Sequence, residues 1–255
     1  MRAHWREYTA EAVALGLFMI SATAATVLLE HPASPLHLSL PDATWRRVLM
    51  GVTMGATAAA IIYSPLGRRS GAHMNPAVTL AFLWLGRITP RDAAAYVAAQ
   101  VLGGITGTAL AAAALAPLAA APEVDYVRTL PGPAGVGPAI AGELVISFLT
   151  LSILLAVAAR PATMRLTGLV AGVVVMANIT FEAPLSGMSM NPARSFGPAL
   201  VAADFSFFWI YLLVPPAGMW LAAAVHARLT RAGLLREACA KFNHSSRVRC
   251  IFCGT

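Results

Sequence analysis

An eight-residue segment built around an Asn-Pro-Ala triplet occurs twice in this 255-residue sequence. It covers residues 70–77 and returns, 116 residues later, at 186–193. Asparagine is among the best N-cap residues, and proline is preferred at the first helical position because the N–H that it lacks would be unpaired there. Each copy therefore predicts the start of a helix, one at Asn75 and one at Asn191.

The two triplets could act on water. A capping asparagine commits its side-chain oxygen to the helix backbone and directs its N–H donors beyond the helix start, which itself carries about half a positive charge. Two such ends facing each other would bind a water molecule through its oxygen and turn its hydrogens outward, which interrupts a proton wire. The same field opposes cations. The pattern favours a conduit for neutral molecules, with Asn75, Asn191 and the polar neighbour His73 at its centre.

The elements that must position these helix ends are membrane spans. Hydrophobic residues make up 58% of the chain and charged residues only 11%, too little charge to cover a water-exposed globule. Apolar stretches near the ~20 residues that cross a bilayer lie at 9–29, 46–63, 92–115, 138–159, 166–182 and 207–227. The first stretch could alternatively be a signal peptide. It is, however, longer than the apolar region that such peptides usually have.

Three spans separate the two triplets, so equivalent segments have opposite orientations in the membrane. Each triplet is followed by a short apolar stretch, 78–85 and 196–203, which is too short to span but suits a re-entrant half-helix. Glu11 and Glu143 stand at matching places in the first and fourth spans. The sequence predicts an all-α membrane protein with six transmembrane helices, two re-entrant half-helices and an inverted three-plus-three repeat.

The basic charge of the chain predicts its orientation. There are 18 Lys and Arg residues against 11 Asp and Glu, a formal net charge of +7. With both termini in the cytoplasm, 14 of the 18 fall on the inner side, as the positive-inside rule requires, so the excess needs no nucleic acid as a partner. The exceptions are Arg46, Arg47, Arg128 and Arg194. Arginine outnumbers lysine 17 to 1, which suggests a bacterial source and hence the inner membrane.

Residues 70–79 (SGAHMNPAVT) and 186–197 (SGMSMNPARSFG) resemble the major intrinsic proteins, the family of aquaporins and glycerol facilitators. The resemblance covers about residues 8–229. It implies a channel rather than an enzyme, with no cofactor required for transport, one pore per subunit and a homotetramer in lipid. It also implies that Glu11 and Glu143 hold the re-entrant loops through hydrogen bonds to backbone.

The same resemblance implies an outer selectivity filter of four residues. Carried over from the two triplets, they are Met54, Ile179, Met188 and Arg194. The first assignment depends on a one-residue insertion, so Gly55 is its alternative. Strict water channels of the family typically carry Phe and His at the first two positions. The more apolar ring of this chain favours a broader filter that also admits small neutral solutes.

The expected function is conduction of water, with passage of other small uncharged solutes and exclusion of protons and ions. Ser195, Ala199 and the pair Phe208-Trp209 resemble the water-channel pattern of the family. A glycerol or small-solute facilitator of the same fold is the alternative. Outside the family, an ion-coupled secondary transporter also uses inverted repeats, but it needs a coupling-ion site. A membrane enzyme is not indicated, because no nucleophile, base and orienting group converge in the sequence.

The end of the chain differs in character. Residues 1–229 are expected to form the transmembrane pore domain, and 230–255 a basic cytoplasmic tail. The tail holds all three cysteines in the pattern C-x4-H-x5-C-x2-C, the ligand types and spacing of a tetrahedral zinc knuckle. The zinc ligands would be Cys239, His244, Cys250 and Cys253. The alternative is an unstructured basic tail close to anionic lipid.

Overall fold

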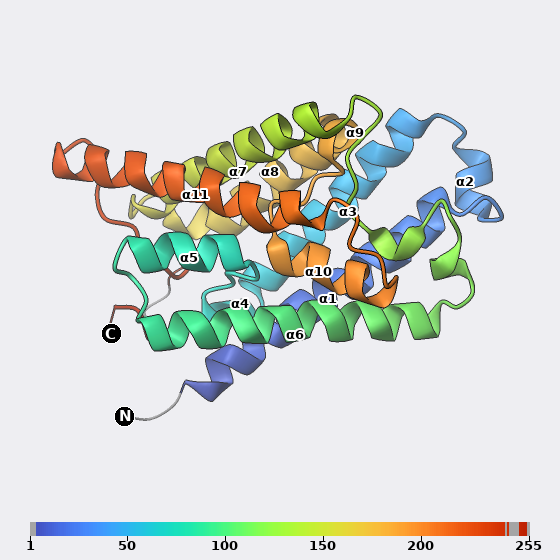
Figure 1. Ribbon diagram of the computed structural model, residues 1–255. Helices are drawn as coiled ribbons and strands as arrows, with labels where there is room; N and C mark the ends of the chain where they lie inside the picture. Colours follow the sequence, from blue (N-terminus) through green and yellow to red (C-terminus); the bar gives the residue numbers. More distant parts are fainter. Residues whose placement is uncertain (1–3, 243, 245–249, 254–255) are drawn as a thin grey trace.

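The computed structural model describes residues 4–242, 244 and 250–253, and throughout these residues the chain is helices joined by loops (Figure 1). Its long helices are α1 (Trp5–Glu30), α3 (Ala43–Tyr63), α6 (Pro90–Ala114), α7 (Val136–Ala158), α8 (Thr167–Phe181) and α11 (Phe208–Arg231). The Asn-Pro-Ala triplets start two shorter helices, α5 (Pro76–Trp84) and α10 (Pro192–Val201). The remaining elements are α2 (Pro35–Ser39), α4 (Pro65–Ser70), α9 (Ala183–Ser186) and the 3-10 turns η1 (Leu118–Ala120), η2 (Asp125–Val127) and η3 (Met164–Leu166).

Five helices in the described part of the chain are long and apolar enough to cross a membrane. They are Trp5–Glu30, Pro90–Ala114, Val136–Ala158, Met164–Phe181 and Phe208–Arg231. Helix α3 completes the predicted set of six, since its 21 residues reach about 31 Å at 1.5 Å per residue. Arg46 in its first turns is neutralised locally: its Nε donates to Glu30 Oε2 at 3.1 Å, and its Nη1 donates to the carbonyls of Leu40 and Pro41. This pairing neutralises one of the basic residues that the expected orientation places on the outer side.

The two halves of the chain pack as an inverted repeat. Helix α1 packs on α6 in the first half, and its counterpart α7 packs on α11 in the second. The half-helices cross over between the halves, because α10 packs on α6 and α5 packs on α11 (Figure 1). Helices α3 and α8, the middle helix of each half, pack on each other. The crossing brings the starts of α5 and α10 to the middle of the molecule.

Small residues allow the middle helices to approach closely. A Cβ added at Gly55 would lie 2.4 Å from the carbonyl oxygen of Gly172, and one added at Gly172 would lie 2.5 Å from that of Gly55. No side chain larger than hydrogen fits between the two backbones at this crossing. Gly55 and Gly172 therefore serve helix packing, as small residues do in membrane helix pairs.

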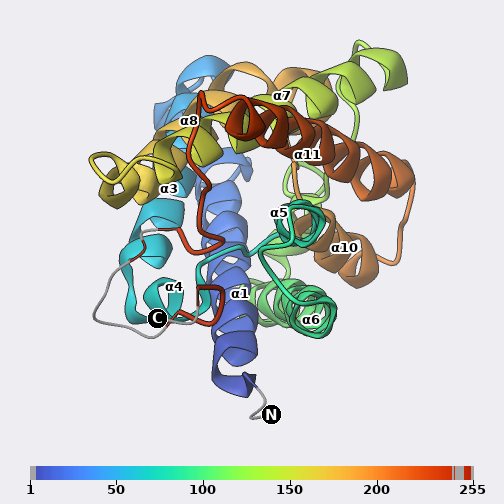
Figure 2. The same ribbon diagram turned by 90° about the vertical axis from the view of Figure 1, so that its left-hand side faces the viewer.

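Both ends of the described chain lie on the same side of the helix bundle (Figure 1). After α11 the chain turns back and crosses the end of the bundle toward α1 and α4 (Figure 2). Ala238, Ala240 and Phe242 are buried here, with 4%, 0% and 3% of their surface exposed. Part of the tail that the sequence suggests as a separate unit therefore packs into the core of the helix bundle.

Candidate functional site

The two half-helices begin with the expected caps. Asn75 precedes α5, and its side-chain oxygen accepts a hydrogen bond from the backbone N–H of Ala77 at 2.8 Å. Asn191 precedes α10, and its oxygen accepts from the N–H groups of Ala193 at 3.1 Å and Arg194 at 3.2 Å. These bonds satisfy N–H groups that have no partner inside a helix, and they fix the direction of each side-chain amide.

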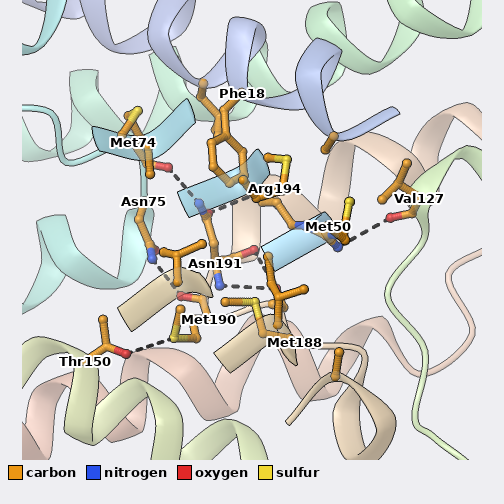
Figure 3. Close-up of a pocket in the computed structure, with 18 of the residues that line it drawn as sticks. Phe18, Met50, Met74, Asn75, Val127, Thr150, Met188, Met190, Asn191 and Arg194 are labelled. Carbon is orange, nitrogen blue, oxygen red and sulfur yellow. Dashed lines mark hydrogen bonds between the residues drawn. The ribbon is translucent and has the colours of Figure 1, made fainter. Parts of the chain in front are cut away.

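The two asparagines also join the repeats to each other. The Asn75 amide nitrogen donates to the carbonyl of Met190 at 2.7 Å, and that of Asn191 donates to the carbonyl of Met74 at 2.7 Å (Figure 3). From the sequence, both N–H donors of each asparagine side chain are expected to face the solute. The structure uses one donor of each asparagine for a bond between the repeats, which leaves the second.

The loops that lead into the triplets have an unusual backbone that is repeated in both halves. Ala72 and Met74 have φ values of 57° and 48°, and Met188 and Met190 have 52° and 54°. Residues other than glycine rarely adopt this left-handed conformation, and when they do it is commonly at functional sites. A left-handed conformation at every second residue keeps these segments out of a helix. Their carbonyls are therefore free to accept the hydrogen bonds between the repeats.

Glu11 holds the first loop from helix α1. Its carboxylate accepts hydrogen bonds from the backbone N–H groups of His73 at 3.0 Å and Met74 at 2.6 Å, and from the hydroxyl of Ser70 at 2.6 Å. Gln100 from α6 donates to the same carboxylate at 2.7 Å. The Glu11 side chain is completely buried, so these donors replace the water that it would otherwise require.

Glu143 does the same for the second loop from helix α7. Its carboxylate accepts from the backbone N–H groups of Ser189 at 2.5 Å and Met190 at 2.8 Å, and from the hydroxyl of Ser186 at 3.1 Å. It is also completely buried. Both carboxylates are thus occupied with loop backbone at equivalent places in the repeat.

A cavity of about 350 Å³ passes the two asparagines. Toward the end of α1 its wall includes Glu30, Arg47, Glu123 and Arg128, and toward the chain termini it includes Ile62, Leu154, Met219 and Phe242. Between these ends it is lined by Asn75, Asn191 and the methionines of both loops. The space is therefore polar at its centre and at one mouth, and apolar at the other.

The four residues assigned to the outer filter all line this cavity. They are Met54, Ile179, Met188 and Arg194. Of the two alternatives for the first filter position, Met54 lines the cavity, whereas Gly55 lies in the contact between α3 and α8. Sequence reasoning missed Phe18, Met50 and Val127, which line the same region and belong to no motif (Figure 3).

Arg194 is fixed by the loop between α6 and α7. Its guanidinium Nη1 donates to the carbonyl of Val127 at 3.4 Å and to the hydroxyl of Thr129. The Thr129 hydroxyl is in turn 3.0 Å from that of Ser195, the neighbour of Arg194 in α10. The cation therefore has a defined position beside the cavity rather than extending to the membrane surface.

That loop is anchored at the surface by Arg128. Its guanidinium Nη2 lies 2.7 Å from Asp125, and Nη1 contacts Asp204 beyond the end of α10. Hydrogen bonds from Ser206, followed by the contact with Arg128, lower the pKa of Asp204 to about 2. Asp204 thus stays ionised, and keeps its partner, at all but strongly acidic pH.

His73 lines the cavity, but its ring is occupied on both edges. Nδ1 is 3.0 Å from the Thr79 hydroxyl, and Nε2 is 2.6 Å from the carbonyl of Ala240 in the tail. The ring also stacks on Phe82 and Phe252, with centroid distances of 5.1 and 5.5 Å. The side chain that sequence reasoning placed at the pore centre thus connects the first loop with the tail.

The four predicted zinc ligands come together in the tail. The Sγ atoms of Cys239, Cys250 and Cys253 and a ring nitrogen of His244 all lie within 4.8 Å of one another. The chain thus presents three thiols and one imidazole at one point, the donor set of a Cys3His zinc site.

Comparison with known proteins identifies relatives of one kind. The sequence model of the major intrinsic proteins matches residues 1–226. Aquaporin NIP1-3 of Oryza sativa is 39% identical over 174 residues, which are 66% of this chain and 59% of the relative. Aquaporin TIP4-4 of Zea mays is 47% identical over 162 residues, 62% of each protein. The chain therefore spans about three fifths of the length of these curated relatives.

The fold has a counterpart among solved structures. The aquaglyceroporin of Plasmodium falciparum superimposes with a TM-score of 0.73 at 18% sequence identity, covering 91% of this chain and 99% of that one. At this identity the likeness shows a shared fold. It agrees with the six-helix, two-half-helix architecture predicted from the sequence.

Proposed function

This chain belongs to the major intrinsic protein family, and on that premise we propose that its central cavity is a passive pore for water that also admits small uncharged solutes. The observation that carries the proposal is the meeting of two helix starts at Asn75 and Asn191 beside one cavity that both residues line. Each start contributes a fixed side-chain amide and the positive end of a helix dipole.

Proton exclusion follows from the same arrangement. A water molecule beside Asn75 and Asn191 accepts hydrogen bonds from their remaining N–H donors and turns its own hydrogens away along the file. A proton can hop along a file only when each water can donate to the next in one direction, so this water interrupts the transfer. The two dipole ends add an electrostatic barrier to cations.

The ring around Arg194 supports a filter broader than that of a strict water channel. Met54, Ile179 and Met188 give it three apolar sides, so a solute with a hydrocarbon backbone meets little desolvation cost there. The cation supplies hydrogen-bond donors on the fourth side. A glycerol facilitator is the second candidate, and this apolar ring is the observation in its favour.

A passive mechanism is supported by the engagement of the buried carboxylates. A coupling ion would need free acidic groups near the centre, whereas Glu11 and Glu143 accept several protein hydrogen bonds each. The same bonds support the proposal that the two residues hold the loops.

The protein is an integral, multi-pass membrane protein by family and helix composition. We place both termini in the cytoplasm, on the distribution of Lys and Arg, and we propose a homotetramer as the assembly. The relatives described above come from plants and Plasmodium, so they lend no support to the bacterial inner membrane expected from the arginine content.

Light scattering from proteoliposomes in a stopped-flow instrument tests the function. A sucrose gradient reports water flux, and a glycerol gradient reports entry of the solute. Both are measured in vesicles with and without a metal chelator, because the tail carries a possible metal site. We expect water flux well above that of empty vesicles and a smaller acceleration for glycerol. Water flux equal to that of empty vesicles in both media would exclude a water pore.

A further inference from the structure

The tail occupies the end of the cavity that faces the chain termini. Phe242 lines the cavity itself, and Ala238, Ala240 and Phe242 belong to the same buried apolar cluster as the two Asn-Pro-Ala loops. Figure 2 shows the segment crossing this end of the bundle. A chain segment in this position narrows the path between the cavity and the solvent on the side of the termini.

Specific contacts hold the segment against the first loop. The backbone N–H of Phe242 donates to the carbonyl of Gly71 at 3.2 Å, and His73 Nε2 donates to the carbonyl of Ala240 at 2.6 Å. Phe252 lies on the other side of the histidine, stacked at a centroid distance of 5.5 Å and an interplanar angle of 11°. The tail is thus bonded to the loop that carries Asn75, not merely adjacent to it.

The surroundings of Gly71 show how closely the tail is seated. Gly71 has a φ of +97°, and a Cβ added there would lie 3.0 Å from the ring of Phe252 and 3.1 Å from the carbonyl oxygen of Ala240. Atoms of the tail therefore occupy the space that a side chain at position 71 would need.

The segment has little regular structure of its own, so something must hold it in this conformation. One contact is the ion pair of Arg87 with Glu237, at 2.5 Å, between partly exposed side chains. Such pairs contribute little in water. The cysteine and histidine cluster flanks the segment, because Cys239 precedes Ala240 directly and His244 follows two residues after Phe242.

The cluster is close to the geometry that a zinc ion needs. Bonds of about 2.3 Å to sulfur and 2.0–2.1 Å to nitrogen place tetrahedral ligand atoms roughly 3.4–3.8 Å apart. The sulfurs of Cys239 and Cys250 are 3.6 Å apart, and those of Cys239 and Cys253, at 2.7 Å, would separate by about 1 Å. The Nε2 atom of His244 is buried and has no hydrogen-bond partner among the described residues, so it is available as a ligand.

We propose that Cys239, His244, Cys250 and Cys253 bind one Zn²⁺ ion, and that the ion locks residues 240–242 across the terminal-side mouth of the pore and closes it. Binding displaces a proton from each of the three thiols, while the imidazole binds in its neutral form. Without zinc only the hydrogen bonds and apolar contacts with the first loop hold the tail, and it leaves the mouth. The closing role rests on the pore function proposed above, whereas the metal site stands independently of it.

Metal content tests the site. The full-length protein, purified under reducing conditions, loaded with Zn²⁺ and desalted, should carry about one zinc per chain by inductively coupled plasma mass spectrometry. Cys250→Ser and His244→Ala should lose it, while His31→Ala, which changes a histidine remote from the tail, should keep it. Substoichiometric zinc in the unchanged protein, or a Cys239–Cys253 disulfide in its peptide map, overturns the site.

Water flux tests the closure and separates it from the pore function. Zinc-loaded vesicles should shrink at least roughly tenfold more slowly than chelated ones. Phe242→Ala, which removes the ring from the cavity but none of the ligands, should bind zinc and conduct in both states. If zinc-loaded and chelated protein conduct equally, closure by zinc is wrong. If chelated protein and Phe242→Ala both fail to conduct, the pore function is wrong instead.

Discussion

Asn191 of the second repeat donates its side-chain amide to the carbonyl oxygen of Met74 in the first, across a distance of 2.7 Å. The carbonyl is exposed to this donor because Met74 has a left-handed backbone, with φ at 48°. The same side chain caps helix α10 with its oxygen. One residue therefore starts a half-helix, joins the repeats and lines the cavity.

Asn191→Ala and Asn191→Asp separate these roles. Alanine removes the cap, at a cost of about 0.5–2 kcal/mol, and leaves the Met74 carbonyl unpaired, at about 1–3 kcal/mol more. Aspartate keeps the capping oxygen, removes the donor and adds negative charge. We expect Asn191→Ala to lower thermal stability in detergent, and Asn191→Asp to admit protons, as read by a pH-sensitive dye inside vesicles. Equal proton flux in Asn191→Asp and the unchanged protein would contradict the barrier proposed for this site.

Arg194→Val tests the filter. It removes the charge and the hydrogen bonds to Val127 and Thr129, and it leaves a ring that is apolar on all sides. We expect glycerol flux to rise several-fold relative to water flux, about what 1 kcal/mol of reduced barrier gives. Arg47→Met is the matched control, because it removes a cation from the mouth of the same cavity but not from the ring. A similar change in both variants would mean that mouth charge, rather than the ring, sets the ratio.

Glu11→Gln tests the support of the first loop. The amide keeps the shape of the carboxylate, but it loses the charge that strengthens hydrogen bonds from Ser70, His73 and Met74. Its NH2 group also cannot accept a hydrogen bond from the donors that surround it. We expect a loss of about 2–4 kcal/mol in stability, measured as resistance to denaturation in mixed micelles. Glu123→Gln, at an exposed position, is the control and should change little. Comparable stability of the two variants would show that Glu11 does not carry the loop.

Gly55→Ala tests the crossing of α3 and α8. The new Cβ would lie 2.4 Å from the Gly172 carbonyl oxygen, so the helices must separate, at a cost of about 1–3 kcal/mol. Gly137→Ala is the control, because no atom beyond its chain neighbours and the nearby backbone of its own helix lies within 4 Å of its Cβ position. Thermal unfolding in detergent should show a clear loss for the first substitution and none, or a small gain, for the second. A crossing that tolerates Gly55→Ala would refute the packing role.

The pair of Arg128 and Asp204 predicts a dependence on pH. Hydrogen bonds from Ser206 and the contact with Arg128 lower the pKa of Asp204 from its ordinary 3.8 to about 2. Because the folded value lies below the unfolded one, the stabilisation is fully present above pH 3.8 and disappears as the pH falls through 2. Asp204→Asn should therefore melt at a lower temperature than the unchanged protein at pH 6, with the difference vanishing near pH 2. A difference that persists at pH 2 would point to a contact that does not involve the carboxylate charge.

The features that depend on neighbours in sequence could be predicted without coordinates. The starts of α5 and α10 follow from Asn-Pro pairs, because capping involves only the first residues of a helix. The long helices begin and end within a few residues of the apolar stretches, because crossing a bilayer demands a minimum apolar length. The inverted order of the halves follows from an odd number of spans between the triplets.

Other features depend on contacts between distant parts of the chain. Whether Met54 or Gly55 faces the cavity was decided by the approach of α3 to α8, and Phe18 has no sequence signal at all. The spacing of Cys239, His244, Cys250 and Cys253 predicted that they could share a metal ion, and the structure brings them together, but the seating of Phe242 in the cavity was not readable from the sequence. A short apolar segment gains its stability from the surface that receives it, and only the folded bundle shows where that surface lies. The sequence by itself therefore determined the helices, their order and the capping asparagines, and the tertiary structure alone decided which side chains line the path and what covers its end.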